Sequence, residues 1–414
     1  MTSVLNRLLQ LSGNKLWLIA AVAAFASCSP KVRPVVQHPA PEAPMPVEKS
    51  KPVVAKPATP RFSTIAIIMP FNLDNLNPAV GYSKTALKQA NMGISYYQGF
   101  KLALDSLTAD GYNFRIQLLD GKDNAGTASA LASNSKVRNA DLVVGPIFPE
   151  GIKAFGTASM KRKLMLSPLS PVSPATFNNP NLITATPPLD YHAKRMAGYA
   201  VNTLKAKKVF VLKSGYSEDN KYIIPFKEAV DSLSKLRVKV IPFVVTRGNL
   251  TSLLPQLSKT ETNVFLLPSL NQAFLQVTLR SLDSLSKNYP VALIGHPSWE
   301  GFTFLRAEML QRLKTVISSS EHINYKSGET VQFIRAYRKA YHNEPDAYAI
   351  RGFDEGMYFG DLLAGSHGNP INAAERDYDG LSNHFHFVRK PGLGWINTHV
   401  FVLRYTNYEL RVVE

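Results

Sequence analysis

Residues 141–171 constrain the fold of this chain more than any other stretch. The apolar, β-branched run Leu142–Val144 is halted by Gly145 and Pro146, as expected of a strand buried on both faces. Residues 149–160 have helical composition, and 164–166 form a second apolar run. A strand–helix–strand unit this short predicts a parallel, right-handed crossover. Because ligands of such sheets bind beyond the carboxyl ends of the strands, the loops after both strands are candidate binding loops.

Residues 1–27 have the features of an export signal. A positively charged start precedes an apolar run of about ten residues at 16–25. This run is shorter than the roughly 20 residues needed to span a bilayer. It ends in Ala-Ser-Cys at 26–28, which resembles the lipobox of bacterial lipoproteins. We therefore expect lipidation at Cys28 and a cell-envelope location. The lack of acidic residues directly after Cys28 favours the periplasmic side, and we expect the outer membrane.

Residues 28–62 are expected to form a lipid-anchored, proline-rich linker. Nine prolines within 29–62 prevent a packed core and favour extended polyproline II. At about 3.1 Å per residue this segment could reach roughly 100 Å. Cys28 is the only cysteine, so a disulfide framework is excluded. The formal net charge of +17 suits anionic envelope polymers or lipid head groups, or simply a solvated surface. No basic cluster interleaved with aromatic residues suggests nucleic acid.

From residue 63 onward the chain alternates strand and helix patterns in two successive series. About 350 residues is enough for two domains. The first series has strands at 64–70, 114–119, 142–144, 164–166 and 182–184, with helices at 94–107, 127–137 and 149–160. The second has strands at 208–212, 238–244, 264–267, 291–294 and 316–320, with helices at 191–204, 225–236, 250–258 and 272–286. Two helices, 328–341 and 347–363, and two late strands, 384–388 and 398–405, follow and are available to complete both series.

The familiar catalytic motifs are missing from the sequence. It contains no GxSxG, HExxH, GxGxxG or P-loop motif, so we expect no enzyme. His384 and His386 would lie on one face of a strand, but no third ligand is in register. We therefore expect no metal and no cofactor. Asp354 and Glu355 would point about 100° apart on a helix and do not form a carboxylate pair.

Five sequence phrases, taken together in their order and spacing, resemble the type I periplasmic-binding-protein family. They are IAIIMPFNLD at 65–74, YYQGFKLALD at 96–105, DLVVGP at 141–146, LSPLSP at 166–171 and YRKAYHNEPDAYAIRG at 337–352. The resemblance covers about residues 63–410. It is nearest to the amino-acid-receptor-like and penicillin-binding-protein-activator-like lipoproteins of Bacteroidetes-type bacteria.

The resemblance implies an α/β fold of two Rossmann-like lobes with parallel sheets, joined by three hinge crossings. We expect these crossings near residues 187–190, 318–322 and 379–383. Lobe 1 would then comprise 63–188 plus 320–380, and lobe 2 would comprise 189–319 plus 381–414. A cleft between the lobes is expected to hold the ligand.

In the amino-acid receptors of this fold, the loops after two neighbouring strands offer hydroxyl groups to the ligand. The first loop here has Phe148 and no hydroxyl. The second keeps Ser167 and Ser170, but Pro171 stands where threonine is common, which removes a hydroxyl and an N–H. A buried carboxylate without partners is costly, so this loss weakens the case for an α-amino acid as ligand.

Further candidate binding residues follow strand ends or lie near the expected hinge. They are Asn72, Tyr216, Ser269, His296, Trp299 and Asp354. Each could equally be a loop cap or a core residue, and for His296 the structural role is the favoured interpretation. We expect Trp299 at the cleft rim, where a large flat side chain provides contact area at low entropic cost.

Two functions fit the sequence. The first is a non-enzymatic, lipid-anchored binding protein that closes two lobes on a small polar ligand such as an amino acid, a peptide or a cell-wall fragment. The second is a scaffold or activator that binds a peptidoglycan-synthesis protein and has a vestigial cleft. The long linker and the lost hydroxyl favour the second. Some relatives carry a LysM module ahead of this fold, but residues 29–62 are too short and proline-rich to form one.

Overall fold

The computed structural model describes residues 62–75, 79, 83–122, 124–365 and 376–414. The expected export signal, the lipidation site Cys28 and almost all of the proline-rich linker lie outside the described residues. In the described part, none of the helices has the length and apolar character needed to cross a bilayer.

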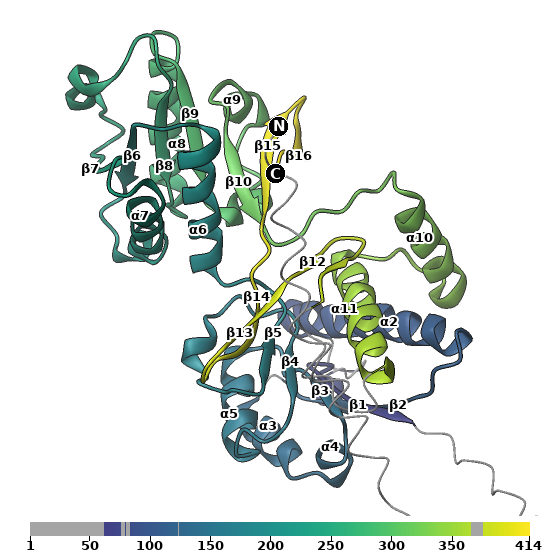
Figure 1. Cartoon of the computed structure of the whole chain (residues 1–414). Helices are drawn as coiled ribbons and strands as arrows, with labels where there is room; N and C mark the ends of the chain where they lie inside the picture. Colours follow the sequence, from purple (N-terminus) through teal and green to yellow (C-terminus); the bar gives the residue numbers. More distant parts are fainter. Residues whose placement is uncertain (1–61, 76–78, 80–82, 123, 366–375) are drawn as a thin grey trace, which may run out of the picture. The chain divides into compact units, whose positions relative to one another are not determined.

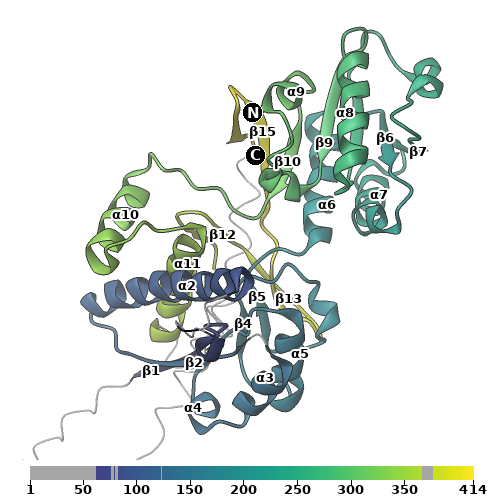
Figure 2. The same ribbon diagram turned by 180° about the vertical axis from the view of Figure 1, so that it is seen from behind.

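The strands of the described residues form two seven-stranded sheets and one two-stranded ladder (Figures 1 and 2). The first sheet has the order β13-β14-β5-β4-β3-β1-β2 and the second has the order β16-β15-β10-β9-β8-β6-β7. In the first sheet, strands β1 to β5 and β14 run parallel and β13 is antiparallel. In the second, β6 to β10 run parallel, and β15 and β16 pair antiparallel. The expected α/β class with two lobes is therefore confirmed.

The strands of the first sheet are β1 Ser63–Met69, β2 Phe114–Asp120, β3 Leu142–Val144, β4 Met165–Ser167, β5 Leu182–Thr184, β13 Phe387–Lys390 and β14 Gly394–Asn397. Those of the second are β6 Lys208–Lys213, β7 Lys239–Val244, β8 Asn263–Leu267, β9 Val291–Gly295, β10 Val316–Ser319, β15 Phe401–Thr406 and β16 Glu409–Val412. The ladder pairs β11 Tyr378–Asp379 with β12 His384–Phe385. The α-helices are α2 Lys84–Ala109, α3 Ala125–Ala132, α4 Ser135–Arg138, α5 Pro149–Ala158, α6 Leu189–Gly198, α7 Asn220–Ser234, α8 Gln272–Leu285, α9 Ala307–Arg312, α10 Gly328–Tyr341 and α11 Ala347–Gly365.

Both faces of each sheet are covered by helices, which explains the continuous apolar strands. In β1, Ile65 and Ile67 pack towards α2 and α11, whereas Ala66 and Ile68 pack towards α3, α4 and α5. In the second sheet, one face packs on α6 and α7 and the other on α8 and α9. Alternate side chains of a strand point to opposite faces, so a strand covered on both faces must be apolar throughout.

Helices α2 and α11 pack unusually closely, because glycines stand at their contact. A Cβ atom on Gly352 would lie 2.1 Å from the backbone oxygen of Tyr96, and one on Gly99 would lie 1.8 Å from that of Ala349. Neither position has room for a side chain. The close approach brings the first turns of α11 beside α2, and this contact shapes one wall of the site described below.

Several element boundaries differ from the sequence prediction. Helix α2 begins at Lys84, ten residues before the expected start at 94, with Ser83 as its N-cap. The single helix expected at 127–137 is two, because Asn134 caps a new helix. Helix α7 begins at Asn220, so Pro225 lies inside it and not at its start. The segment expected to be helical at 250–258 is a 3₁₀ turn, η6 Thr251–Gln256.

The described part of the chain passes between the two sheets three times. It does so at 185–188, at 320–327 and at 398–400. The third crossing was expected near 379–383, and that position is wrong. Strands β13 and β14 form a hairpin that returns to the first sheet, where Trp395 of β14 pairs with Ile183 of β5. Residues 381–397 therefore belong with the first sheet. The sequence prediction missed β14 because its four residues lie next to a turn and give no periodic signal.

Candidate functional site

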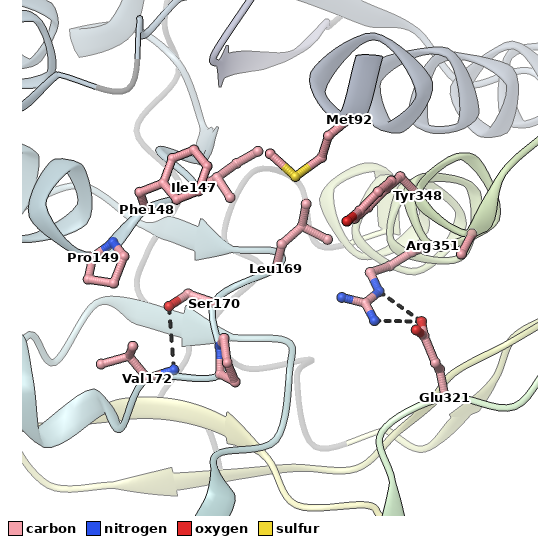
Figure 3. Close-up of a pocket in the computed structure, with 12 residues that line it drawn as sticks. Met92, Ile147, Phe148, Pro149, Leu169, Ser170, Val172, Glu321, Tyr348 and Arg351 are labelled. Carbon is pink, nitrogen blue, oxygen red and sulfur yellow. Dashed lines mark hydrogen bonds and ion pairs between the residues drawn. The ribbon is translucent and has the colours of Figure 1, made fainter. Parts of the chain in front are cut away.

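A cavity of about 450 Å³ lies at the carboxyl edge of the first sheet, where the loops after β3 and β4 emerge (Figure 3). Residues from α2, from α11 and from the crossing after β10 complete its wall. The lining residues are Met92, Ile147, Phe148, Pro149, Leu169, Ser170, Pro171, Val172, Glu321, Ala347, Tyr348 and Arg351. Small-molecule sites in proteins commonly have volumes of roughly 300–1,000 Å³, so this cavity is large enough for a small ligand.

Most of the cavity wall is apolar. Ile147 and Phe148 come from the loop after β3, Leu169 from the loop after β4, and Met92 from α2. Figure 3 shows these four side chains gathered at one end of the cavity, with Tyr348 and Arg351 of α11 beside them. A wall of this kind suits a ligand with a substantial apolar part.

Charge in the described cavity wall is concentrated in one ion pair. Arg351 donates from Nε and Nη2 to the same oxygen of Glu321, at 3.1 and 2.5 Å. The Arg351 side chain is 12% exposed and that of Glu321 is 27% exposed. Burial alone would lower the pKa of Arg351, but the Glu321 carboxylate raises it above its usual value. Figure 3 shows the remaining guanidinium nitrogen pointing away from Glu321. No hydrogen bond or ion pair of that nitrogen is found among the described residues.

A buried carboxyl group lies next to Arg351 along α11. Glu355 accepts a hydrogen bond of 2.6 Å from the Tyr96 hydroxyl across the α2–α11 contact. Burial raises the pKa of Glu355 to about 8, even though the Tyr96 hydrogen bond and the Arg351 charge act in the opposite direction. Glu355 is therefore largely protonated at neutral pH. A neutral Glu355 adds no negative charge beside Arg351, so Glu321 is the carboxylate that pairs with the guanidinium in the described cavity wall.

Two of the residues predicted from the sequence line this cavity. Phe148 is the N-terminal flanking residue of α5 and packs half-buried beside the core. Ser170 is buried, and its hydroxyl accepts a long hydrogen bond of 3.4 Å from the Val172 amide (Figure 3). Ser167 is not a lining residue. It is buried at the end of β4, and its hydroxyl makes no hydrogen bond within the described part of the chain.

Asn72 and Tyr216 occupy loops away from this cavity. The Asn72 backbone has a positive φ of 52°, its amide donates to Asp120 and its side chain donates to Pro70 and Gln89. These contacts make it a loop-shaping residue. Tyr216 is 61% exposed and precedes the short turn that leads into α7.

Trp299 is a core residue and not a cleft-rim residue, so that expectation is wrong. Its side chain is 1% exposed, packs in the core of the second sheet and donates from Nε1 to the Ser269 carbonyl at 3.0 Å. Gly295 leaves space for the indole, because a Cβ there would lie 2.4 Å from the ring. Ser269 is also buried, and its hydroxyl accepts a hydrogen bond from the Asn271 amide.

His296 has a structural role in the described chain. Its Nδ1 accepts a hydrogen bond from the Ser298 amide at 3.1 Å, and its ring packs on Tyr222. Burial, with a smaller contribution from neighbouring His192, lowers the pKa of His296 to about 4. The ring is therefore neutral at physiological pH and acts as a cap for the turn η7 Pro297–Gly301.

Asp354 connects α11 to the loop after β11 through hydrogen bonds. Its carboxylate accepts hydrogen bonds from the amides of Leu381, Ser382 and Asn383 and from the Ser382 hydroxyl. Burial raises the pKa of Asp354 to about 6, although these hydrogen bonds oppose the shift. Asp354 and Glu355 thus have separate sets of partners, as expected from their spacing on the helix.

His384 and His386 each contact a different carboxylate. The nearest pairs are His384 with Asp379 at 2.5 Å and His386 with Asp377 at 2.6 Å. In the described ranges, no group of three or more histidine, cysteine, aspartate or glutamate residues could hold a metal ion.

Sequence reasoning missed the residues that dominate the cavity. Met92, Tyr348, Arg351 and Glu321 come from two helices and a crossing that are distant in sequence. One signal was available, because Arg351 is the only basic residue in the largely apolar helix α11. Glu321 follows three serines and gives no pattern of its own.

Two α/β lobes joined by chain crossings, with a cavity at the carboxyl edge of the first sheet, define the fold class of this chain. A family model described as periplasmic binding protein matches residues 85–376. The chain therefore belongs to the periplasmic-binding-protein family, of the type I fold.

Comparison with solved structures shows the same fold. A putative branched-chain amino acid ABC transporter from Rhodospirillum rubrum is 14% identical, covers 85% of this chain and 100% of its own, and has a TM-score of 0.60. An ABC transporter substrate-binding protein from Desulfitobacterium hafniense in complex with Leu is 16% identical, with coverage of 85% and 100% and a TM-score of 0.54. No curated protein matches the chain in a sequence comparison.

Proposed function

We propose that this chain is a non-catalytic, extracytoplasmic binding protein for a small molecule that has an apolar part and a carboxylate. In this proposal the apolar part occupies the wall formed by Met92, Ile147 and Leu169. The carboxylate binds the free side of the Arg351 guanidinium, which is suited to charge-assisted hydrogen bonds. The observation that carries the proposal is the position of Arg351, paired with Glu321, at the edge of a mostly apolar cavity.

The ion pair offers a substitute for the hydroxyl groups that are missing from the first binding loop and from position 171. In the described part of the chain, both hydrogen bonds from Arg351 go to one oxygen of Glu321. The second oxygen of Glu321 is then available for a ligand ammonium group. An apolar amino acid or a short peptide carries both charges, and these are the ligand classes that we propose first. A cell-wall peptide fragment has the same terminal carboxylate.

The proposal includes attachment to the outer membrane through lipid on Cys28, with the proline-rich linker as a tether on the periplasmic side. Membership of the periplasmic-binding-protein family supports an extracytoplasmic location. The lipobox-like sequence at 26–28 supports the anchor. Mass spectrometry of the protein from bacterial membranes tests the anchor, because lipidation at Cys28 removes residues 1–27 and adds acyl chains.

Thermal-shift measurement with matched ligands tests the binding proposal. A ligand that binds only the folded state must raise its stability. Leucine, leucyl peptides and muropeptides carry a free carboxylate, whereas leucinamide is the matched compound without one. We expect stabilisation by at least one carboxylate class and none by leucinamide. Stabilisation by leucinamide to the same degree as by leucine would contradict the role given to Arg351.

The alternative function, a scaffold or activator of peptidoglycan synthesis, predicts a different result in the same experiment. No small molecule would stabilise the protein, and a penicillin-binding protein would co-purify with it from membranes. That combination would overturn the receptor proposal.

A further inference from the structure

The second sheet has a separate cavity of about 370 Å³ at the edge where its parallel strands begin. Its described lining includes three lysines, Lys205, Lys207 and Lys208, which lie just before or at the start of β6 and are exposed. Glu261 is the acidic residue in this lining and pairs with Lys207 at 2.6 Å. None of these residues belongs to the Arg351 cavity.

The basic character of this edge extends beyond the cavity. Lys208 of β6 and Lys239 of β7 are directly opposite each other in the parallel ladder, and both are exposed. Like charges in opposite positions destabilise a sheet, so the fold gains nothing from this pair. Other exposed basic residues precede β7, β8 and β9, namely Lys235, Arg237, Lys259 and Lys287. Among the described ion pairs, none includes Lys205, Lys208 or Lys239.

The dimensions of this edge suit an extended partner. Strands in a sheet lie about 4.8 Å apart, so the row of basic residues that begins at β7 and reaches β9 is roughly 15 Å long. Figure 1 shows these strands side by side, and the sheet order is β9-β8-β6-β7. Lysine ammonium groups are point charges on flexible stems, which suit separate charges along a chain better than one planar group.

The cavity also offers uncharged hydrogen-bonding groups beside the lysines. Gln256 and Thr262 line it and are exposed. The segment 256–262, which carries both residues, is held in place by the Asn263 side chain. This side chain accepts a hydrogen bond from the Ser258 amide and donates to the carbonyls of Ser258 and Pro290. Amide and hydroxyl groups of this kind can bind sugar hydroxyls, while the lysines bind acidic groups.

We propose that this edge binds a segment of an acidic polysaccharide. Its carboxylate, sulfate or phosphate groups would contact Lys205, Lys208 and Lys239, and its hydroxyl groups would contact Gln256 and Thr262. A single-stranded nucleic acid fits less well, because Phe210, the aromatic residue of the cavity wall, is buried and cannot stack on a base. An anionic bilayer presents a broad surface and would not use a cavity.

Binding of the full chain in detergent to polygalacturonate, a carboxylate polysaccharide, tests the proposal. Neutral dextran serves as the uncharged comparison. We expect binding to polygalacturonate that weakens as salt is raised, since these exposed charges are screened, and no binding to dextran. The triple variant Lys205→Glu/Lys208→Glu/Lys239→Glu should bind at least tenfold more weakly. The matched triple variant Lys84→Glu/Lys88→Glu/Lys136→Glu makes the same change in net charge at exposed lysines on α2 and α4, and should retain affinity within about twofold.

Three results would overturn the proposal. One is equal weakening in the two variants, which would mean that net charge alone decides binding. Another is tighter binding to polyglutamate or to phosphatidylglycerol vesicles than to polygalacturonate, which would identify an acidic peptide or a bilayer as the partner. The third is full affinity in the triple variant. Leucine-dependent stabilisation is measured on the same variants and should be unchanged, which separates this site from the Arg351 cavity.

Discussion

At the scale of single residues, the ion pair between Arg351 and Glu321 requires the desolvation of two charged groups, which is unfavourable for folding. Transferring two charges from water to a partly buried site is unfavourable, and a buried pair is often no more stable than apolar residues of the same size. Here the pair stands at the edge of a cavity whose other walls are largely apolar. We interpret this ion pair as part of the ligand-binding site and not as a contribution to the stability of the fold.

Removal of one partner should destabilise the protein more than removal of both. Arg351→Met leaves the Glu321 carboxylate unpaired and should lower the free energy of unfolding by about 2 kcal/mol. This is less than the 3–5 kcal/mol typical of a fully buried pair, because Glu321 keeps some solvent contact. The double variant Arg351→Met/Glu321→Leu should recover most of this loss. Denaturant unfolding of the three proteins provides the measurement, and additive losses would rule out this interpretation.

Glu355 should make stability depend on pH. The folded protein raises the pKa of Glu355 from 4.5 to about 8, so it holds this proton more tightly than the unfolded chain does. The stabilisation is complete below about pH 4.5 and is lost as the pH rises through 8. The melting temperature of the natural protein should therefore fall more steeply between these values than that of Glu355→Gln, which keeps a neutral acceptor for Tyr96.

The exposed residue Glu308 on α9 provides the control for this pH experiment. Glu308→Gln should follow the natural protein across the whole range. Parallel melting curves for Glu355→Gln and the natural protein would show that Glu355 does not titrate in this interval.

At the scale of elements, the contact between α2 and α11 fixes the cavity wall. Gly352 allows the two helices to approach, and Met92, Tyr348 and Arg351 are carried to the cavity by the same pair of helices. Gly352→Ala should lower the free energy of unfolding by at least about 2 kcal/mol, because the added methyl meets the Tyr96 backbone and overpacking is costly. Thermal or denaturant unfolding measures this loss.

Gly365→Ala is the matched variant for this helix contact. Gly365 lies at the end of the same helix, and a Cβ there would meet no atom of the described residues within 4 Å. It should change stability little, or raise it slightly through helix propensity. If both substitutions lowered the free energy of unfolding equally, the loss would come from replacing a glycine anywhere in α11 and not from the contact with α2.

Elements with a strong local pattern were predictable from the sequence, and the cavity was predictable only in part. Strands β3 and β4 were recognised because short apolar runs end at glycine, proline or serine, and parallel pairing then placed both loops at one edge. Phe148 and Ser170 followed from that placement. Trp299 did not, because whether its indole points outward or onto Gly295 depends on the geometry of one short turn.

The ion pair at the cavity could not be predicted from the local sequence, for a related reason. Arg351 and Glu321 meet through a chain crossing and a helix contact, and neither leaves a periodic trace in the sequence. Strand β13 was expected in part, within 384–388, but its hairpin partner β14 was missed. Strand β14 has only four residues, and its pairing with β5 joins segments about 200 residues apart. Long-range pairing of this kind is set by the tertiary fold and not by local propensity.

At the scale of the whole molecule, family membership and the cavity lead to one functional account. The chain belongs to the periplasmic-binding-protein family, and the first sheet supplies a mostly apolar cavity with a single described arginine in its wall. The sequence adds a lipobox-like cysteine and a proline-rich linker. Together they support our proposal of a receptor that is held at a membrane and binds small carboxylates.

Calorimetric titration of the best-stabilising carboxylate ligand tests this account most directly. It compares the natural protein with Arg351→Gln and with Arg335→Gln, a change of an exposed arginine on α10. A charge-assisted hydrogen bond is worth roughly 1.5–3 kcal/mol, so Arg351→Gln should weaken binding by at least about tenfold. Arg335→Gln should bind as the natural protein does. Undiminished affinity in a folded Arg351→Gln variant would contradict the assignment of the ligand carboxylate to Arg351.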